Sequence, residues 1–259
     1  LLKQTPPDDS YFGRNQGSQL YGHAIATMAL AEVYGNESDL NQRRQVRAAL
    51  QRAVEVLLAA QKAPKKEPID KGGWHYEPDS NSADLSVTAW CLLALRSAHN
   101  AGMDVPRQAI TDAQAYVLRC YRDDQKGFAY KPRNNATASM TAAAVLALCL
   151  TDAAERDEVK QASQFLLDHL VDEKTPYFHY AHYYATQAAH QLGGSAWAKI
   201  WPHTYDSLSR RQLKDGSFRP APGEPGKQID GNRAQAVYAT SMSVLALSVP
   251  YRLLPIYQR

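Results

Sequence analysis

Helical segments of two kinds alternate along the chain. Four segments are amphipathic, with an apolar stripe at helical spacing and a charged opposite face: 38–62, 107–121, 154–172 and 195–213. In the first of them Val46, Leu50 and Leu57 share the apolar stripe, and arginines occupy the other side. The segments between them are almost free of charge, which is typical of a helix that is buried on all sides. The alternation predicts an all-α fold in which an inner ring of roughly parallel helices is wrapped by outer amphipathic helices.

A threonine recurs within each uncharged segment. Five such residues are followed by small and apolar side chains: Thr27, Thr88, Thr141, Thr186 and Thr240. Ala-Leu comes six and seven residues after three of them, at 94–95, 147–148 and 246–247. Internal self-similarity of this kind is the sequence signature of a repeat architecture. The chain is therefore predicted to consist of repeated helical hairpins, with one inner helix around each threonine.

The loops that lead into the predicted inner helices share an aromatic residue, usually close to glycine. The copies are Tyr11-Phe12-Gly13, Gly72-Gly73-Trp74, Gly127-Phe128, Tyr177-Phe178 and Gly216-Ser217-Phe218. Glycine allows the tight turn at the end of an outer helix. We expect Trp74, Phe128 and Phe218 to be wedges between neighbouring hairpins rather than ligand contacts. The polar, proline-containing stretch 219–233 is the longest and most flexible of the predicted loops.

The order of outer helix, Gln, Gly, aromatic residue and inner helix resembles the prenyltransferase and squalene-cyclase repeat. The best copies run from Gln212 to Phe218 and, with an insertion, from Gln61 to Trp74. The segments 72–90, 179–197 and 251–257 are also similar to uncharacterised bacterial toroid proteins. The resemblance implies an α/α toroid domain at 20–259, as in terpenoid cyclases, preceded by an N-terminal strap or linker remnant at 1–19.

The number of predicted hairpins is smaller than the resemblance implies. Five inner and four outer helices make about four and a half hairpins, whereas toroids of this family commonly close with about six. Either the ring is small or open, or hairpins outside this sequence complete it. Because the sequence also begins without Met, we expect a piece of a larger protein, cytoplasmic or of the cell envelope.

The zinc ligands of protein prenyltransferases are not retained. The family pattern D-x-C-Y-S-x-W aligns with residues 84–90, so Asp84 is kept and Ser86 stands at the thiolate position. The family pattern Y-H-T aligns with residues 238–240, so Ala239 stands at the histidine position. Zinc requires thiolate, imidazole or carboxylate ligands, which the last two positions lack. The sequence predicts no metal site and no cofactor.

The motifs of other family chemistries are also missing. The DxDD acid of squalene-hopene-type cyclases, the GCGEQ of thioester domains and a DDxxD magnesium motif do not occur in the chain. Asp84 is the one reasonable candidate for a catalytic acid, which would need a buried carboxyl with a strongly shifted pKa. Alternatively, its carboxylate caps the helix that begins at Leu85.

The repeat alignment places candidate ligand-binding residues at equal depth, near the predicted N-termini of the inner helices. His23, Asp84 and His182 share one register, and Tyr184 follows two residues later in its repeat. Either these side chains bind a ligand, or they fill the mouth of the barrel and hydrogen-bond one another. Free N–H groups at helix N-termini favour an anionic or hydrogen-bonding group. The candidate ligand-binding residues are His23, Ser86, Ser139, His179, His182, Tyr184 and Tyr238.

Composition excludes several partner classes. The 259 residues include 29 Lys and Arg against 26 Asp and Glu, and the net charge of +3 is too small for a nucleic-acid or anionic-membrane footprint. The longest uncharged stretches, 136–150 and 236–250, are shorter than a membrane-spanning helix. Cys91, Cys120 and Cys149 lack metal or disulfide spacing, so we expect buried, inert thiols.

Three functions remain open on the sequence. The first is a ligand-binding or scaffold module that uses the toroid mouth, for a polar-headed apolar small molecule or an acidic peptide end. The second is a terpenoid-cyclase-like enzyme that acts on an isoprenoid or other apolar substrate with Asp84 as its acid. The third is a domain of a larger cell-envelope protein whose exposed rim binds protein or peptide.

Overall fold

The computed structural model describes residues 11–14, 19–222, 224, 227–253 and 255–257. The chain forms two compact units. Unit 1 comprises Leu1–Cys120, Tyr130–Asn134 and Leu254–Arg259, and unit 2 comprises Tyr121–Ala129 and Asn135–Leu253. The described residues are mostly helical, which confirms the predicted all-α class, and they form one short two-stranded sheet.

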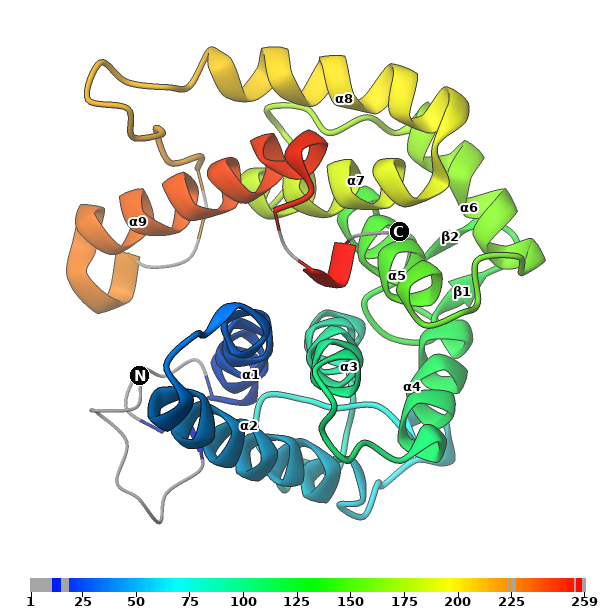
Figure 1. Ribbon diagram of the computed structural model, residues 1–259. Helices are drawn as coiled ribbons and strands as arrows, with labels where there is room; N and C mark the ends of the chain where they lie inside the picture. The colour runs from blue at the N-terminus through cyan, green and yellow to red at the C-terminus, as the bar shows by residue number, and fades with distance from the viewer. Residues whose placement is uncertain (1–10, 15–18, 223, 225–226, 254, 258–259) are drawn as a thin grey trace. The chain divides into compact units, whose positions relative to one another are not determined.

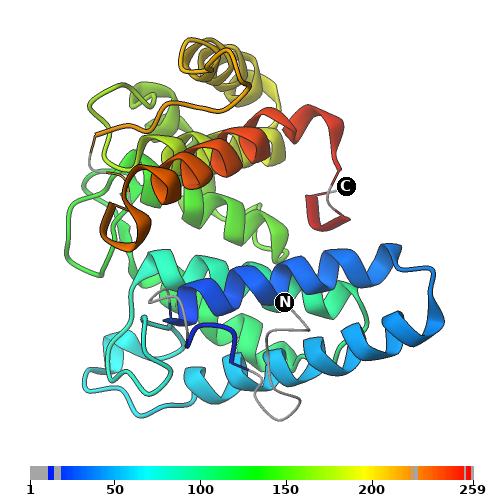
Figure 2. The same cartoon turned by 90° about the vertical axis from the view of Figure 1, so that its left-hand side faces the viewer.

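Unit 1 consists of two helical hairpins and two short 3₁₀ turns. The helices are α1 (Gln19–Asn36), α2 (Leu40–Gln61), α3 (Leu85–Asn100) and α4 (Arg107–Arg119), and the turns are η1 (Pro68–Asp70) and η3 (Pro255–Tyr257). Helices α1 and α3 lie side by side, with α2 packed beneath both and α4 against α3 (Figure 1). The view rotated by 90° shows α1 and α2 as one antiparallel hairpin (Figure 2). The odd-numbered helices are thus the inner layer of this unit.

The inner helices of unit 1 run parallel. Tyr21, near the start of α1, lies against Trp90 in the first half of α3, with ring centroids 6.0 Å apart. Near the other end, the Ser97 hydroxyl of α3 donates a hydrogen bond to the buried Glu32 carboxylate of α1. The Ile256 N–H of η3 donates to the same carboxylate at 3.3 Å and so ties the C-terminal segment to these two helices.

Unit 2 contains five helices and the two-stranded sheet. The elements are β1 (Tyr121–Arg122), β2 (Gly127–Phe128), α5 (Ala138–Leu150), α6 (Asp157–Asp168), α7 (Phe178–Leu192), α8 (Gly194–Ser209), α9 (Lys227–Leu247) and the 3₁₀ turn η2 (Val249–Tyr251). Strand β1 pairs with β2 in antiparallel register. Helix α7 packs between α5 and α9, while α6 packs on α5 and α8 on α7. The inner layer of unit 2 is therefore α5, α7 and α9.

Burial follows the two predicted helix types. In α3, every residue from Leu85 to Leu95 is buried, and in α7 every residue from Phe178 to Ala189 is buried. Outer helix α6 buries one stripe, which consists of Val159, Ala162, Phe165 and Leu166. The uncharged segments are inner helices because no face of them is suited to water.

The glycines before the entry-loop aromatics make room for the next outer helix. A Cβ at Gly72, where φ is +84°, would collide with the backbone carbonyl of Asp112 in α4. A Cβ at Gly73 would lie 2.7 Å from the Tyr116 ring of the same helix. In unit 2, a Cβ at Gly127 would lie 3.0 Å from the Phe165 ring of α6. Close helix approach therefore accounts for the repeated glycine, in addition to the turn geometry expected from the sequence.

Two expectations concern segments at the edges of these elements. The predicted strap at 1–19 lies mostly outside the described residues, and Gln19 already belongs to α1. The stretch 219–233, predicted to be one flexible loop, is helical from Lys227, where α9 begins. The last proline of this stretch is Pro225, and the polar residues after Gly226 are compatible with a helix. The predicted loop is therefore too long at its C-terminal end, because it was inferred from polar composition alone.

Candidate functional site

Three of the recurring threonines hold the backbone of an entry-loop aromatic residue. The Trp74 N–H donates to the Thr88 hydroxyl at 3.0 Å, the Phe128 N–H to Thr141 at 2.9 Å, and the Phe218 N–H to Thr240 at 3.1 Å. We call this contact the Thr–aromatic clasp. The three rings are at most 2% exposed, as a wedge role requires. The repeat that marks the inner helices is therefore a structural device.

The two remaining threonines have other roles. The Thr27 hydroxyl donates to the His23 carbonyl one turn earlier in α1, at 2.8 Å. The Thr186 hydroxyl donates to the Thr204 hydroxyl of α8, at 3.1 Å. Similar sequence around a threonine thus predicts its place on an inner helix but not its hydrogen-bond partner.

Protein side chains occupy the N-termini of three inner helices. The Asp84 carboxylate accepts from the Val87 N–H at 2.9 Å and caps α3. Thr137 caps α5 through the Met140 N–H. At the start of α7, the His179 N–H donates to the Glu224 carboxylate at 2.9 Å. Each of these acceptors uses one of the N–H groups that a helix start leaves without an intrahelical partner.

Asp84 is a fully buried carboxyl with a basic surrounding. Burial raises its pKa to about 6, although the Val87 N–H, the nearby Tyr130 hydroxyl and Lys131 act to lower it. The His75 Nε2 lies 3.7 Å from the Asp84 Oδ2. Burial lowers the pKa of His75, and the charges of Lys131 and Lys65 lower it further. His75 is therefore neutral at neutral pH, and the positive charge of this group resides on the lysines.

Half-buried aromatic rings lie next to this basic group. Tyr21 and Tyr76 stack with ring centroids 6.4 Å apart and planes 16° from parallel. The His75 ring meets Tyr76 edge-on at 5.2 Å. Burial raises the pKa of Tyr130 well above its usual value, with Asp84 and Tyr76 as further causes. We call the group formed by Tyr21, Lys65, His75, Tyr76, Tyr130 and Lys131 around Asp84 the Asp84 cluster.

His23, a predicted ligand-binding residue, is held by the backbone on both ring nitrogens. The Phe12 N–H donates to His23 Nδ1 at 3.1 Å, so His23 Nε2 carries the proton and donates to the Ala53 carbonyl at 3.0 Å. The ring also stacks on Phe12, and it is fully buried. His23 therefore connects the segment before α1 to helix α2.

His179 and His182 lie in a second polar group, in unit 2. His179 Nδ1 lies 2.6 Å from Glu224 Oε1, and both side chains are fully buried. Burial acts to raise the pKa of Glu224, but the hydrogen bonds from His179 and Ala221 outweigh it and hold the pKa below its usual value. The carboxylate fixes the proton of His179 on Nδ1. His179 thus joins α7 to the segment that precedes α9.

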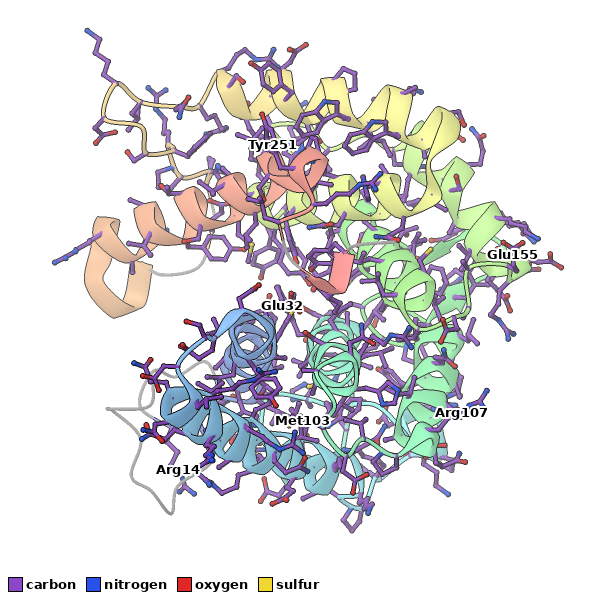
Figure 3. All side chains as sticks on the ribbon, viewed as in Figure 1. Arg14, Glu32, Met103, Arg107, Glu155 and Tyr251 are labelled. Atoms are coloured by element: carbon purple, nitrogen blue, oxygen red, sulfur yellow. The ribbon has the colours of Figure 1, made fainter. Side chains whose placement is uncertain are left out.

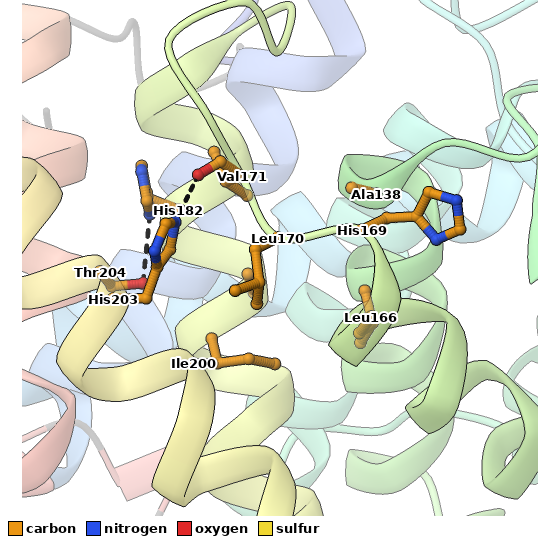
Figure 4. A pocket seen from close by; sticks show the side chains of 10 residues that line it. Ala138, Leu166, His169, Leu170, Val171, His182, Ile200, His203 and Thr204 are labelled. Carbon is orange, nitrogen blue, oxygen red and sulfur yellow. Dashed lines mark hydrogen bonds between the residues drawn. The ribbon is translucent and has the colours of Figure 1, made fainter.

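His182 lines a small cavity between α6, α7 and α8. Its Nδ1 lies 3.1 Å from the Thr204 hydroxyl, while His203 Nε2 donates to the Val171 carbonyl at 2.6 Å (Figure 4). Burial and, to a smaller extent, the charges of His203, His179 and Arg211 together lower the pKa of His182 to about 3. The cavity measures about 10 Å³, roughly the space of one water molecule, and its other walls are mainly apolar. It does not fit an isoprenoid.

The other predicted ligand-binding residues are divided between the two units. Ser86 is buried in the first turn of α3, beside Asp84. In unit 2, the hydroxyl oxygen of Ser139 lies 3.4 Å from that of Thr137, the cap of α5. Tyr238 is half-buried on α9. Tyr184 is fully buried between the rings of Tyr180 and Tyr183.

The residues at the aligned zinc positions do not form a zinc donor set. Asp84 uses one oxygen as a helix cap, Ser86 offers a hydroxyl and Ala239 a methyl group. Among the described residues, no group of three or more histidine, cysteine or carboxylate side chains is placed to hold a metal ion.

The expected burial of the cysteines is confirmed for Cys91 and Cys120 and is wrong for Cys149. Cys91 and Cys120 are buried free thiols whose pKa values burial raises, and Cys149 is half-buried. Within the described part of the chain, no helix combines the length and apolar character needed to cross a membrane.

Glu224 and the six residues that surround Asp84 in its cluster were not identified from the sequence. Glu224 lies 45 residues after its partner His179, inside a stretch that resembles a flexible loop. The backbone of Tyr130 accepts from the Leu85 N–H at 2.8 Å, which brings Tyr130 and Lys131 to Asp84. His75 lies near Asp84 because the Asp84 N–H donates to the carbonyl of the preceding residue, Trp74, at 2.9 Å. The sequence signal that could have indicated the Asp84 cluster is the set of aromatic and basic residues around Gly72-Gly73-Trp74.

Comparisons with known proteins give a fold and no family. No protein-family model and no curated protein matches the chain. Among solved structures, the chain is similar to Candida albicans protein geranylgeranyltransferase-I complexed with GGPP, at 15% sequence identity and a TM-score of 0.50. The match covers 83% of this chain and 69% of that one. The similarity shows that the chain has the all-α toroid fold of this prenyltransferase.

Proposed function

We propose that the protein is a ligand-binding toroid module whose ligand has an apolar, unsaturated chain and an anionic head group. The Asp84 cluster is the binding surface. The observation that carries the proposal is the placement of two half-buried, stacked rings, Tyr21 and Tyr76, beside a basic group. The charges of Lys65 and Lys131 in that group lower the pKa of His75, which contacts the Tyr76 ring. Aromatic faces suit an isoprenoid chain, and ammonium groups suit a phosphate.

The lysines of the cluster are suited to exchange their present partners for a ligand. Lys65 donates to the Ser80 carbonyl at 2.9 Å, and Lys131 to the Ser82 hydroxyl at 3.4 Å. Both acceptors are neutral, and within the part of the chain that the structure describes neither ammonium group forms an ion pair with a carboxylate. Burial lowers the pKa of Lys65, which a bound anion would oppose. GGPP, present in the similar solved structure, is a suitable probe because it has both chemical parts.

Titration calorimetry with GGPP and with geranylgeraniol tests the proposal. We expect Lys131→Ala to weaken GGPP binding about tenfold and to leave geranylgeraniol binding unchanged, because only GGPP has the charge. Tyr76→Ala should weaken both. Lys160→Ala is the matched control, since Lys160 is an exposed lysine on α6 of unit 2. If the protein binds neither compound, or if Lys131→Ala and Lys160→Ala act alike, the proposal is wrong.

A second candidate function is an acid-catalysed reaction of the same ligand. It is favoured by the pKa of Asp84, which burial brings to about 6 and so within range of a proton donor. Its cap bond to Val87 opposes this role, because that bond stabilises the ionised carboxylate. Incubation of isoprenoid substrates with the protein and with Asp84→Asn, followed by product analysis, separates the two functions. A product that forms equally with both proteins would exclude Asp84 as the acid.

A further inference from the structure

The outer helix α2 has a strongly basic composition. Between Leu40 and Gln61 it contains four arginines and a single acidic residue, Glu55. Arg43, Arg44 and Arg47 are exposed in its first two turns. Within the described parts of the chain, none of these three forms an ion pair with a carboxylate. The small net charge of the whole chain therefore conceals a local concentration of positive charge.

Two of these arginines are held in place by Tyr34 of α1. The Arg43 guanidinium lies over the Tyr34 ring, 5.1 Å from its centroid, and Arg47 Nη1 donates to the Tyr34 hydroxyl at 3.3 Å. The hydrogen bond from Arg47 is the main cause that lowers the pKa of Tyr34. Ordered guanidinium groups lose less conformational freedom when they bind a partner.

The nearest carboxylates are already used by the turn between α1 and α2. Glu37 accepts from the Asp39 N–H at 2.9 Å, and Asp39 caps α2 through the N–H groups of Asn41 and Gln42. Two large apolar side chains on either side of this turn are exposed: Val33 at 51% and Leu40 at 68%. The hairpin end thus presents arginines, a tyrosine and apolar side chains together.

We propose that this end of the α1–α2 hairpin, formed by Val33, Tyr34, Leu40, Arg43, Arg44 and Arg47, docks an acidic protein segment. Carboxylates of the segment would pair with the guanidinium groups, and an apolar side chain of the segment would cover Leu40. Arginine and tyrosine are enriched in protein interfaces, whereas lysine is depleted. An anionic membrane would be served equally well by lysines, and α2 has none between Leu40 and Gln61. The composition therefore favours a protein partner.

Fluorescence anisotropy with a labelled peptide of glutamates and two leucines tests the surface. We expect binding that weakens with salt, and a loss of about tenfold or more in Arg43→Glu and Arg47→Glu. The peptide with glutamine in place of glutamate should not bind. Arg107→Glu is the matched control, because Arg107 is an exposed arginine that projects from the outer helix α4 (Figure 3). Circular dichroism checks that each variant is folded.

Each other outcome would overturn the inference. Equal weakening in Arg107→Glu would mean general electrostatic attraction without a defined surface. If Arg43→Glu removed binding to phosphatidylserine vesicles while the peptide did not bind, the partner would be a membrane. If the peptide binds neither the wild-type protein nor a variant, there is no such docking surface. GGPP binding at the Asp84 cluster is measured separately, so failure of one proposal leaves the other open.

Discussion

Removing one Thr–aromatic clasp should destabilise unit 1 by an amount that the structure defines. In Thr88→Val, which preserves side-chain shape, the Trp74 N–H loses its acceptor at 3.0 Å while remaining buried. The Trp74 carbonyl keeps its own bond, because the Asp84 N–H donates to it at 2.9 Å. The bond that the Thr88 hydroxyl donates to this carbonyl, at 3.4 Å, is also lost. The main loss is therefore one buried donor without a partner, which costs about 1–3 kcal/mol.

Urea unfolding followed by tryptophan fluorescence measures this free energy, and thermal unfolding should show a drop of about 4–8 °C for a loss of about 2 kcal/mol. Amide hydrogen exchange gives a local readout, since the Trp74 amide should lose protection in Thr88→Val and keep it in Thr88→Ser. Thr111→Val is the control, because the Thr111 hydroxyl is exposed on α4 and bonds only within its helix. A free energy of unfolding within about 0.5 kcal/mol of the wild type, with unchanged Trp74 protection, would refute the clasp.

Three further predictions concern the Trp74 side chain, the buried His182 and the buried Asp84. Trp74→Ala should lower the free energy of unfolding by about 3–5 kcal/mol, since its ring is fully buried and its Nε1 donates to the Leu57 carbonyl at 2.8 Å; an unchanged melting temperature would contradict the wedge. The folded-state pKa of His182 is about 3, below its unfolded value, so the wild type should lose stability as pH falls from about 6.5 towards 3. His182→Gln should lose less, as acid titrations of unfolding would show. The pKa of Asp84 is raised to about 6, so its contribution to stability should be present below its unfolded pKa and lost as pH rises through 6. Asp84→Asn should flatten that part of the profile, and a parallel profile would mean that the carboxyl titrates normally.

The helices and their layers could be predicted because they depend on charge patterns within short segments. The absence of charge around Thr88 and Thr141 requires burial on all sides, and no knowledge of distant residues is needed to conclude this. The buried wedges were predictable for the same reason, since a large ring beside glycine at a helix junction has few other places to go. Asp84 was recognised as a residue with two possible roles, and the structure shows that it caps α3.

The polar groups could not be predicted because their members come from distant parts of the chain. Glu224 reaches His179 across 45 residues, and its proline-rich surroundings predict a solvated loop. His23 was expected to bind a ligand from its register alone, yet its two nitrogens meet the backbone of Phe12 and Ala53. Register on a helix fixes depth, but hydrogen-bond partners depend on loops whose paths the sequence pattern does not contain.

The Thr–aromatic clasps have a consequence for how such a protein can vary. Each clasped segment closes a small antiparallel bridge, between Trp74 and Asp84, Ala129 and Ala136, or Gln212 and Phe218. At the first two bridges an N–H before the inner helix donates to the carbonyl of the aromatic residue, from Asp84 to Trp74 at 2.9 Å and from Thr137 to Phe128 at 3.1 Å. The third bridge encloses the turn that precedes Phe218, and the three enclosed stretches differ in length and sequence. The cost of closing a loop rises only slowly with its length. The segment 213–217 belongs to neither polar group and its hydrogen bonds lie mainly within the turn itself. It is therefore a natural site for grafting: a designer can exchange it for a recognition loop while leaving the helices beneath it untouched.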